Sequence, residues 1–123
     1  MDYILIGDKN YSSFEEILFL ENHTPGVPLV MLGVLEDEFP IAAAAMEIDD
    51  HVTRLISIYV EKPHRKKGIG AGLVNQLSEY THANDLDALE VDFVETEDLQ
   101  KFFKHKDLHF STEPKFCICP WMM

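Results

Sequence analysis

The chain has 123 residues and carries 22 acidic against 10 basic side chains, which gives a net charge of −12. Hydrophobic residues make up 46% of it and charged residues 26%, the balance of a globular protein rather than of a disordered one. We therefore expect a single domain over residues 1–123. The acidity argues against a nucleic-acid-binding protein, because neutralising phosphates requires a basic surface.

The cellular setting also follows from the composition. No apolar run approaches the roughly 20 residues of a membrane-spanning helix, and the N-terminus lacks the basic flank and apolar core of a signal peptide. The two cysteines, Cys117 and Cys119, are too few for a disulfide framework or a zinc site, and the spacing of the histidines fits no metal site. We expect a cytoplasmic protein that binds neither a membrane nor a metal ion.

The first third of the chain predicts strands with one helix among them. Ser12 or Ser13, followed by acidic residues, is typical of a capping box that opens a helix. The alanine run at 42–45 also fits a helix, but its β-rich neighbours favour a strand. The expected elements are a strand at 2–6, a helix that ends near residue 20, a turn at 24–28, and strands at 29–36 and 40–48 joined by the acidic residues 36–38.

A strand, a basic loop and a helix follow one another in the middle of the chain. Residues 53–60 are rich in isoleucine, valine and tyrosine and predict a strand. Apolar residues recur at helical spacing from Ile69, and the helix is expected to end near Asn84. The loop between them is either a solvated charged loop or a binding site, because four basic residues fall within six positions: Lys62, Arg65, Lys66 and Lys67.

This arrangement is typical of an anion-binding site. A helix begins with unpaired main-chain N–H groups at the positive end of its dipole. Gly68, Gly70 and Gly72 allow a ligand to approach the main chain closely, and lysine and arginine add charge-assisted hydrogen bonds. We expect the ligand to be a phosphate or a diphosphate.

Three phosphate-binding signatures can be compared with this loop. The chain has no G-x-x-x-x-G-K-[ST] string, so it has no P-loop. Its glycines are spaced as G-x-G-x-G, rather than as the G-x-G-x-x-G of dinucleotide-binding folds. The third signature, R-x-x-G-x-G/A, is met in full by residues 65–70.

With the strand before it and the helix after it, the stretch IYVEKPHRKKGIGAGLVNQL resembles the coenzyme A loop of the GNAT superfamily of acetyl-CoA-dependent N-acyltransferases. The resemblance extends over about residues 30–116 and is most specific over residues 58–77. It implies an α/β fold of the α+β type, with a central, mixed, mostly antiparallel sheet of six or seven strands and about three helices.

The resemblance also implies a set of residues that bind acetyl-CoA. Main-chain groups of the strand before the loop would pair with the pantetheine arm and the acyl carbonyl, at Ile58, Tyr59 and Val60. Main-chain amides of the loop and the first helical turn would hold the diphosphate, at Arg65, Lys66, Lys67, Gly68, Ile69, Gly70 and Ala71. Pro63 lies one residue later than the usual proline of the family.

The implied function is transfer of an acetyl group from acetyl-CoA to an amine of a small molecule or a protein. The acidity of the chain suits a cationic acceptor. A second hypothesis is a CoA-binding sensor or interaction module that has kept the fold and lost the chemistry. A third is a protein that binds another phosphate ligand.

The catalytic residues stay unassigned. A strand at 86–94 and a helix at about 96–106 are expected downstream, and the resemblance places Phe103 where many relatives have a tyrosine proposed to protonate the departing thiolate. Phenylalanine has no such proton to donate. Ser57 and Tyr59 are alternative donors on the preceding strand. The candidate bases are Glu61, Glu90 and Asp92.

The two ends of the chain bear on the acceptor site and on assembly. Relatives have two helices between their first strands that usually wall the acceptor site, whereas this chain has room for one. The acceptor site is therefore open, reduced or completed by a second subunit. The apolar segment 116–121 predicts a last strand ended by Pro120, and its exposed end suggests pairing with another chain in a homodimer.

Overall fold

The computed structural model describes residues 1–21 and 23–91. Within these residues the chain forms five strands and two α-helices, fewer than the six or seven strands and about three helices expected. The expected helix at 96–106 and the last strand at 116–120 lie outside the described residues. The elements are β1 Asp2–Leu5, α1 Tyr11–Phe14, the 3₁₀ helix η1 Glu15–Ile17, β2 Leu29–Glu36, β3 Phe39–Asp49, β4 Val52–Val60, the 3₁₀ helix η2 Lys62–His64, α2 Ile69–Ala83 and β5 Ala88–Val91.

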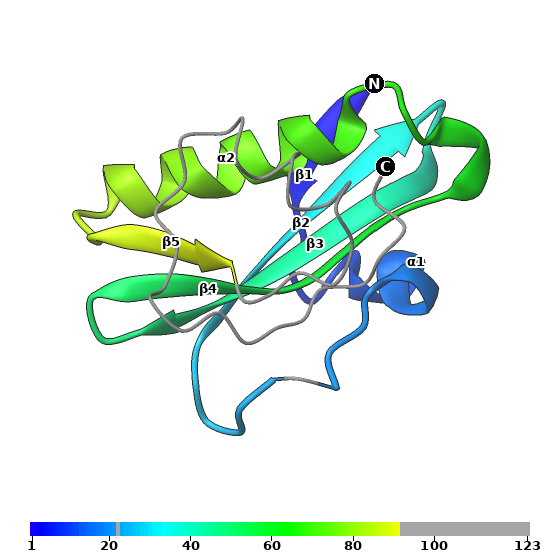
Figure 1. The fold of residues 1–123 in the computed structure, drawn as a ribbon. Helices are drawn as coiled ribbons and strands as arrows, with labels where there is room; N and C mark the ends of the chain where they lie inside the picture. The colour runs from blue at the N-terminus through cyan, green and yellow to red at the C-terminus, as the bar shows by residue number, and fades with distance from the viewer. Residues whose placement is uncertain (22, 92–123) are drawn as a thin grey trace.

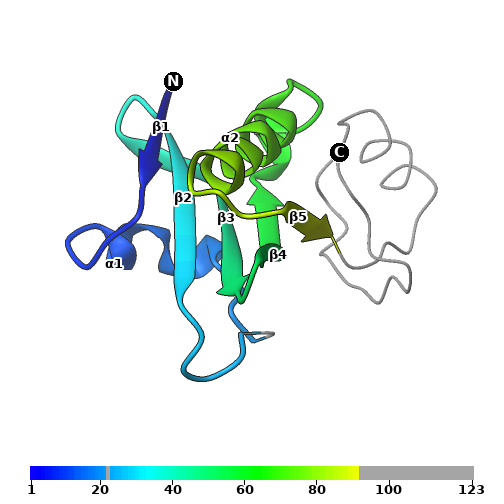
Figure 2. The ribbon, with the colours of Figure 1, turned by 90° about the vertical axis from the view of Figure 1, so that its left-hand side faces the viewer.

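The strands form one mixed sheet in the order β1-β2-β3-β4-β5. The first four strands pair antiparallel with their neighbours in sequence, and β5 pairs parallel with β4. Helix α2 provides the crossover that a parallel pair needs. Figure 2 shows the strands side by side in this order, with α2 over β3 and β4. The mixed, mostly antiparallel sheet expected from the sequence is confirmed.

The N-terminal helix is shorter than expected and begins differently. Helix α1 covers Tyr11–Phe14 and continues only as the 3₁₀ turn η1, which ends at Ile17 rather than near residue 20. The predicted capping box is wrong, because Ser12 and Ser13 already lie inside the helix and its first residue is preceded by Asn10, which makes no side-chain cap. The Asn10 Oδ1 atom instead accepts a hydrogen bond from the main-chain N–H of Gly7, at 2.7 Å.

The alanine run is a strand, and the small size of its side chains explains the layering. Residues 42–45 are fully buried in the middle of β3. Ala42 and Ala44 contact the apolar cluster under α2, and Ala43 and Ala45 contact the cluster under α1 and η1. Successive side chains of a strand point to opposite faces, so β3 is covered on both faces. Figure 1 shows α2 and α1 on opposite sides of the sheet.

The hairpin between β2 and β3 turns where the sequence predicts. Asp37 and Glu38 both have positive φ angles, of 50° and 69°. Two consecutive residues of this conformation are typical of the type I′ turn, whose twist matches that of paired strands. The acidic residues 36–38 are therefore the hairpin connection, as expected.

A β-bulge divides β4 into two halves. Ala45 lies opposite Ser57, but Met46 lies opposite Leu55, so Ile56 is an extra residue without a partner on β3. The parallel pairing with β5 covers Val52–Leu55 of β4 and reaches the residue before this bulge. In the described residues, β4 then continues to Val60 with a pairing strand on its β3 side alone (Figure 1). A bulge at this position bends the strand and increases its local twist.

The packing of α1 on the sheet requires a glycine at position 33. A Cβ atom at Gly33 would overlap the Phe14 ring, which is buried to 1% exposure. We expect Gly33→Ala to lower the free energy of unfolding by roughly 1–3 kcal/mol, because the ring has no room to move in a packed core. Urea denaturation measures this change, with Gly7→Ala as the control, since a Cβ atom there meets nothing within 4 Å. Equal midpoints for the two variants would contradict this packing.

Candidate functional site

The loop between β4 and α2 begins with a single 3₁₀ turn, η2. His64 N–H donates to the Glu61 carbonyl at 2.8 Å, and Arg65 N–H donates to the Lys62 carbonyl at 3.3 Å. Pro63 fits this turn, because proline is tolerated at the start of a helical turn. The turn carries the chain from the end of β4 to the start of α2 and so presents the basic residues together at one end of the sheet.

The Arg65 side chain folds back onto β4. Its Nε atom donates a hydrogen bond to the Val60 carbonyl at 2.7 Å, and its guanidinium carbon lies 5.4 Å from the centre of the Tyr59 ring. A cation over an aromatic face is attracted by the ring quadrupole. The structure thus brings Arg65 together with Tyr59 and Val60, and the arginine holds the loop against the strand that precedes it.

The chain enters α2 through left-handed main-chain conformations. Lys66 has a φ angle of 66° and Gly68, the residue before the helix, has a φ angle of 84°. A side chain at the Gly68 position would be strained at that φ even though the space around it is open. The glycine of the R-x-x-G motif is therefore required by the turn itself.

The start of α2 leaves a run of main-chain amides available. The first helical hydrogen bond runs from Gly72 N–H to the Gly68 carbonyl at 2.9 Å. Within residues 1–21 and 23–91, no oxygen accepts a hydrogen bond from the amides of residues 66–71. Arg65 differs from the expectation here, because its own amide is already bonded to Lys62.

The charges around these amides are positive. Lys62, Lys66 and Lys67 are exposed, and none of them forms an ion pair with another described residue. Gly68 is also exposed, whereas Ile69 and Gly70 are buried and Ala71 is half-buried. The positive end of the helix dipole adds to the field of the lysines. Together they make this loop a candidate anion site within a strongly acidic chain.

The loop is also tied to the rest of the sheet. His64 Nδ1 lies 3.6 Å from a carboxylate oxygen of Glu36, at the end of β2. On α2, Gly72 lies against Tyr3 of β1, so that a Cβ atom there would overlap the phenol. The Tyr3 hydroxyl donates to the Ile69 carbonyl at 3.5 Å, and burial raises the pKa of Tyr3, so the hydroxyl keeps its proton. These contacts fix the first turn of α2 relative to the strands.

The strand residues expected to bind the cofactor face in two directions. The side chains of Ile58 and Val60 are buried in the cluster under α2, and Tyr59 lies on the other face, half-buried. All three follow the bulge at Ile56 and end the strand that leads into the loop between β4 and α2. Their expected role in binding acetyl-CoA stays a prediction.

The candidate acids and bases are spread over this region. Ser57 is buried at the bulge, where its Oγ atom accepts a hydrogen bond from the Phe19 N–H at 3.2 Å. Glu61 is half-buried at the end of β4. Glu90 lies opposite Arg54 in the register of β4 and β5, half-buried, on the face away from the α2 cluster that holds Leu89. Asp92 and Phe103 lie outside the described residues.

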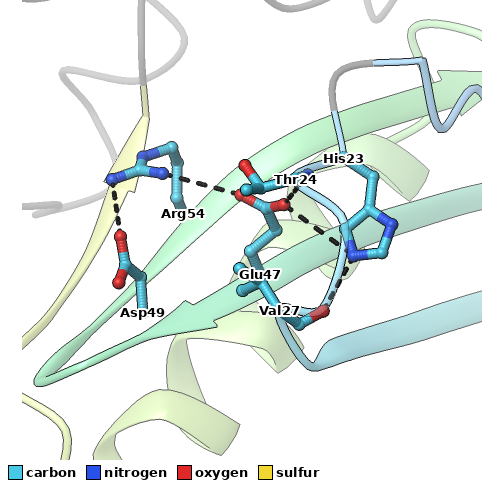
Figure 3. A network of polar contacts seen from close by, with 6 residues as sticks. All are labelled: His23, Thr24, Val27, Glu47, Asp49 and Arg54. Carbon is cyan, nitrogen blue, oxygen red and sulfur yellow. Dashed lines mark hydrogen bonds and ion pairs between the residues drawn. The ribbon is translucent and has the colours of Figure 1, made fainter.

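The sequence analysis missed a buried carboxylate on β3. Glu47 is 1% exposed, and its carboxylate accepts a hydrogen bond from the main-chain N–H of Thr24. The same oxygen, Oε2, lies 3.9 Å from the His23 Nε2 atom, and the other oxygen, Oε1, lies 3.5 Å from the Arg54 guanidinium (Figure 3). The available signal was an acidic residue directly after an apolar run that the sequence predicts to be a strand.

Two further properties concern metals and membranes. The described residues contain no group of three or more histidine, cysteine, aspartate or glutamate side chains placed to hold a metal ion. None of the helices in this part of the chain has the length and apolar character needed to cross a bilayer.

Comparisons with known proteins can now be set beside this geometry. Comparison with curated protein sequences finds no match. Among solved structures, an aminoglycoside N-acetyltransferase in complex with CoA superimposes with a TM-score of 0.73 at 15% identity, over 98% of this chain and 99% of that one. An acetyltransferase from Trypanosoma brucei gives 0.73 at 14% identity, over 96% and 98% of the two chains. A ribosomal-protein-alanine N-acetyltransferase from Brucella melitensis biovar Abortus 2308 gives 0.70 at 14%, over 97% and 99%.

These similarities concern the fold, and the family follows from the sequence itself. The profile of the acetyltransferase (GNAT) family matches residues 4–110, which is most of the chain. The match spans the anion site, the bulged strand and the helix that follows them. The chain is therefore a member of the GNAT acetyltransferase family.

Proposed function

We propose that this protein transfers an acetyl group from acetyl-CoA to the amine of a cationic acceptor. The observation that carries the proposal is the run of main-chain amides at residues 66–71, which donate to no other described residue, are flanked by exposed lysines and directly follow the bulged strand. Such a run is suited to a diphosphate, because each N–H can donate to a phosphate oxygen. Membership of the GNAT family makes acetyl-CoA the diphosphate ligand to test first.

The residues of the loop and of β4 would divide the work of binding. The amides of residues 66–71 would hold the diphosphate, with Lys66 and Lys67 beside it. The main-chain edge of residues 58–60 would pair with the pantetheine arm and polarise the acyl carbonyl. Arg65 would keep the two parts in register through its bonds to Val60 and Tyr59.

The chemistry is an acyl transfer. When bound, acetyl-CoA supplies a thioester, whose C–S bond breaks as the C–N bond to the amine forms. The proton that leaves the amine ends on the sulfur of CoA, by way of a base and an acid. Glu90 and Glu61 are the described candidates for the base, and the Tyr59 and Ser57 hydroxyls are the described candidates for the acid.

The negative charge of the chain is the reason for proposing a cationic acceptor. The net charge of −12 attracts cations over long distances, and in residues 1–53 the only basic side chain is Lys9. The cytoplasm is the proposed compartment, the whole chain the proposed domain, and a homodimer the proposed assembly.

A second candidate function is a module that binds CoA without turnover. The observation that favours it is Phe103, which replaces the hydroxyl-bearing residue expected at that position of the family.

Isothermal titration with acetyl-CoA, CoA and ATP tests which cofactor binds, and a thiol-release assay with spermidine, an aminoglycoside and a lysine peptide tests turnover. Acetyl-CoA binding with thiol release supports the transferase, and binding without release on any of the three amines supports the module. Absence of binding to both CoA species would contradict both functions.

Adding a negative charge at the first turn of α2 should weaken cofactor binding strongly. We expect Gly70→Glu to weaken acetyl-CoA binding about 100-fold, or roughly 3 kcal/mol, because the side chain blocks the main chain and repels phosphate. Isothermal titration measures the affinity. Asn75→Glu is the matched control, since it places the same charge at an exposed position of the same helix.

Because Gly70 is buried, its substitution also tests the packing of α2. The double variant Lys66→Glu, Lys67→Glu avoids this complication, since both lysines are exposed. It should weaken acetyl-CoA binding about tenfold or more through like-charge repulsion alone. Wild-type affinity in this double variant would place the diphosphate elsewhere.

The contacts that Arg65 makes with β4 can be tested separately from its charge. We expect Arg65→Gln to weaken acetyl-CoA binding about tenfold, because the loop loses its bond to Val60 and its contact with the Tyr59 ring. Lys62→Gln removes the same charge from an exposed position of the same loop and should change the affinity by less than about threefold. If the two variants bind equally well, Arg65 contributes its charge and not its contacts.

A further inference from the structure

We infer that Glu47 is a positioning residue for the amine acceptor, an inference that rests on the proposed transferase function. Its buried carboxylate fixes Thr24 and His23 on the face of the sheet from which the amine reaches the thioester.

The carboxylate is buried at a cost that its partners must offset. An ionised side chain removed from water is strongly destabilising unless it is paired and hydrogen-bonded. Glu47 has a cation on one side, with the Arg54 guanidinium at 3.5 Å, and a main-chain donor on the other, the Thr24 N–H. Arg54 is itself oriented by Asp49, at 3.3 Å. Glu47 therefore links the connection between η1 and β2 to the β3–β4 ladder.

The residues that Glu47 contacts form a closed turn. The Val27 N–H donates to the Thr24 carbonyl at 3.1 Å. The His23 Nε2 atom lies 2.8 Å from the Val27 carbonyl, which can only accept, so this nitrogen carries the hydrogen. The same nitrogen lies 3.9 Å from the Glu47 carboxylate, so His23 is a neighbour of the carboxylate and its hydrogen bond goes to Val27 (Figure 3). The Thr24 N–H donates to the Glu47 carboxylate, so the turn and the carboxylate form one hydrogen-bonded unit.

This unit lies on the face of the sheet opposite α2. Glu47 and Arg54 are partners in the β3–β4 register, so their side chains share a face. Phe19, in the same connection, contacts that face further along β4, with its N–H on Ser57 Oγ and its ring 5.4 Å from the Tyr59 ring. The connection is thus attached to β3 at Glu47 and to β4 at Ser57 and Tyr59, which follow the bulge at Ile56.

The position of α2 determines how an amine can approach. Helix α2 packs across β3, β4 and β5 on one face, and its N-terminal amides belong to the proposed cofactor site at the end of that face. An amine that attacks a thioester held at residues 58–60 would therefore approach from the face of the sheet opposite α2. On this face the side chains beside the bulge are Ser57, Tyr59 and the pair Glu47–Arg54, with Phe19 and Thr24 against them.

Steady-state kinetics and calorimetry test the inference with three variants and one control. The variants are Glu47→Ala, Glu47→Gln and His23→Ala, assayed with the best amine among spermidine, an aminoglycoside and a lysine peptide. Glu47→Ala should raise the KM for the amine about tenfold or more, while the Kd for acetyl-CoA stays within about twofold of wild type. Glu47→Gln keeps an acceptor for the Thr24 N–H, and His23→Ala keeps the carboxylate, so each should raise that KM about threefold.

The control is Thr81→Val, which removes a buried polar contact on the α2 face, where the Thr81 and Thr53 hydroxyl oxygens lie 2.7 Å apart. It should lower the thermal midpoint without changing the KM for the amine. If Glu47→Ala does not fold, Glu47→Gln and His23→Ala decide the question by the same comparison. The inference would be overturned if the folded Glu47 and His23 variants kept the wild-type KM for the amine, or if Thr81→Val raised that KM equally. Either result would leave the proposed function intact. Absence of turnover by the wild-type protein would instead overturn the proposed function.

Discussion

The bulge at Ile56 is the constraint on which the rest of the structure depends. One extra residue on β4 leaves Ile56 without a partner on β3, between Leu55, which lies opposite Met46, and Ser57, which lies opposite Ala45. A shift of one residue also changes which side chains face each layer. It lets Ile56 pack under α1 while Leu55 and Ile58 pack under α2. The basic loop after β4 and the buried carboxylate of Glu47 lie on either side of this irregularity.

The central strand allows this arrangement because its side chains are small. The four small alanine side chains of β3 let the helices on both faces pack close to the sheet. The two apolar clusters are therefore fully packed around the centre of β3. Larger residues there would push α2 away from β4, and with it the amides at the start of the helix. Glu47 ends the buried part of the same strand, where the connection from η1 rather than a helix covers the sheet.

The sequence predicted the strand–loop–helix unit well because its signals are local. Period-two and period-3.6 patterns and two glycines determine β4, α2 and the turn between them, and the left-handed φ of Gly68 is a property of that residue. The capping box failed because Asn10, two residues earlier, occupies the cap and bonds to Gly7 instead. Glu47 could not be assigned a role, because its partners come from distant segments and no spacing relates them to it. The roles predicted for Asp92 and Phe103 lie outside the described residues and stay predictions.

The contact between β1 and the first turn of α2 makes the edge strand a support for the candidate anion site. Tyr3 lies against Gly72, and its hydroxyl donates to the Ile69 carbonyl, so β1 holds the end of the helix whose first amides donate to no other described residue. A change that displaces β1 would therefore shift the start of α2 through Tyr3, without altering any residue of the basic loop.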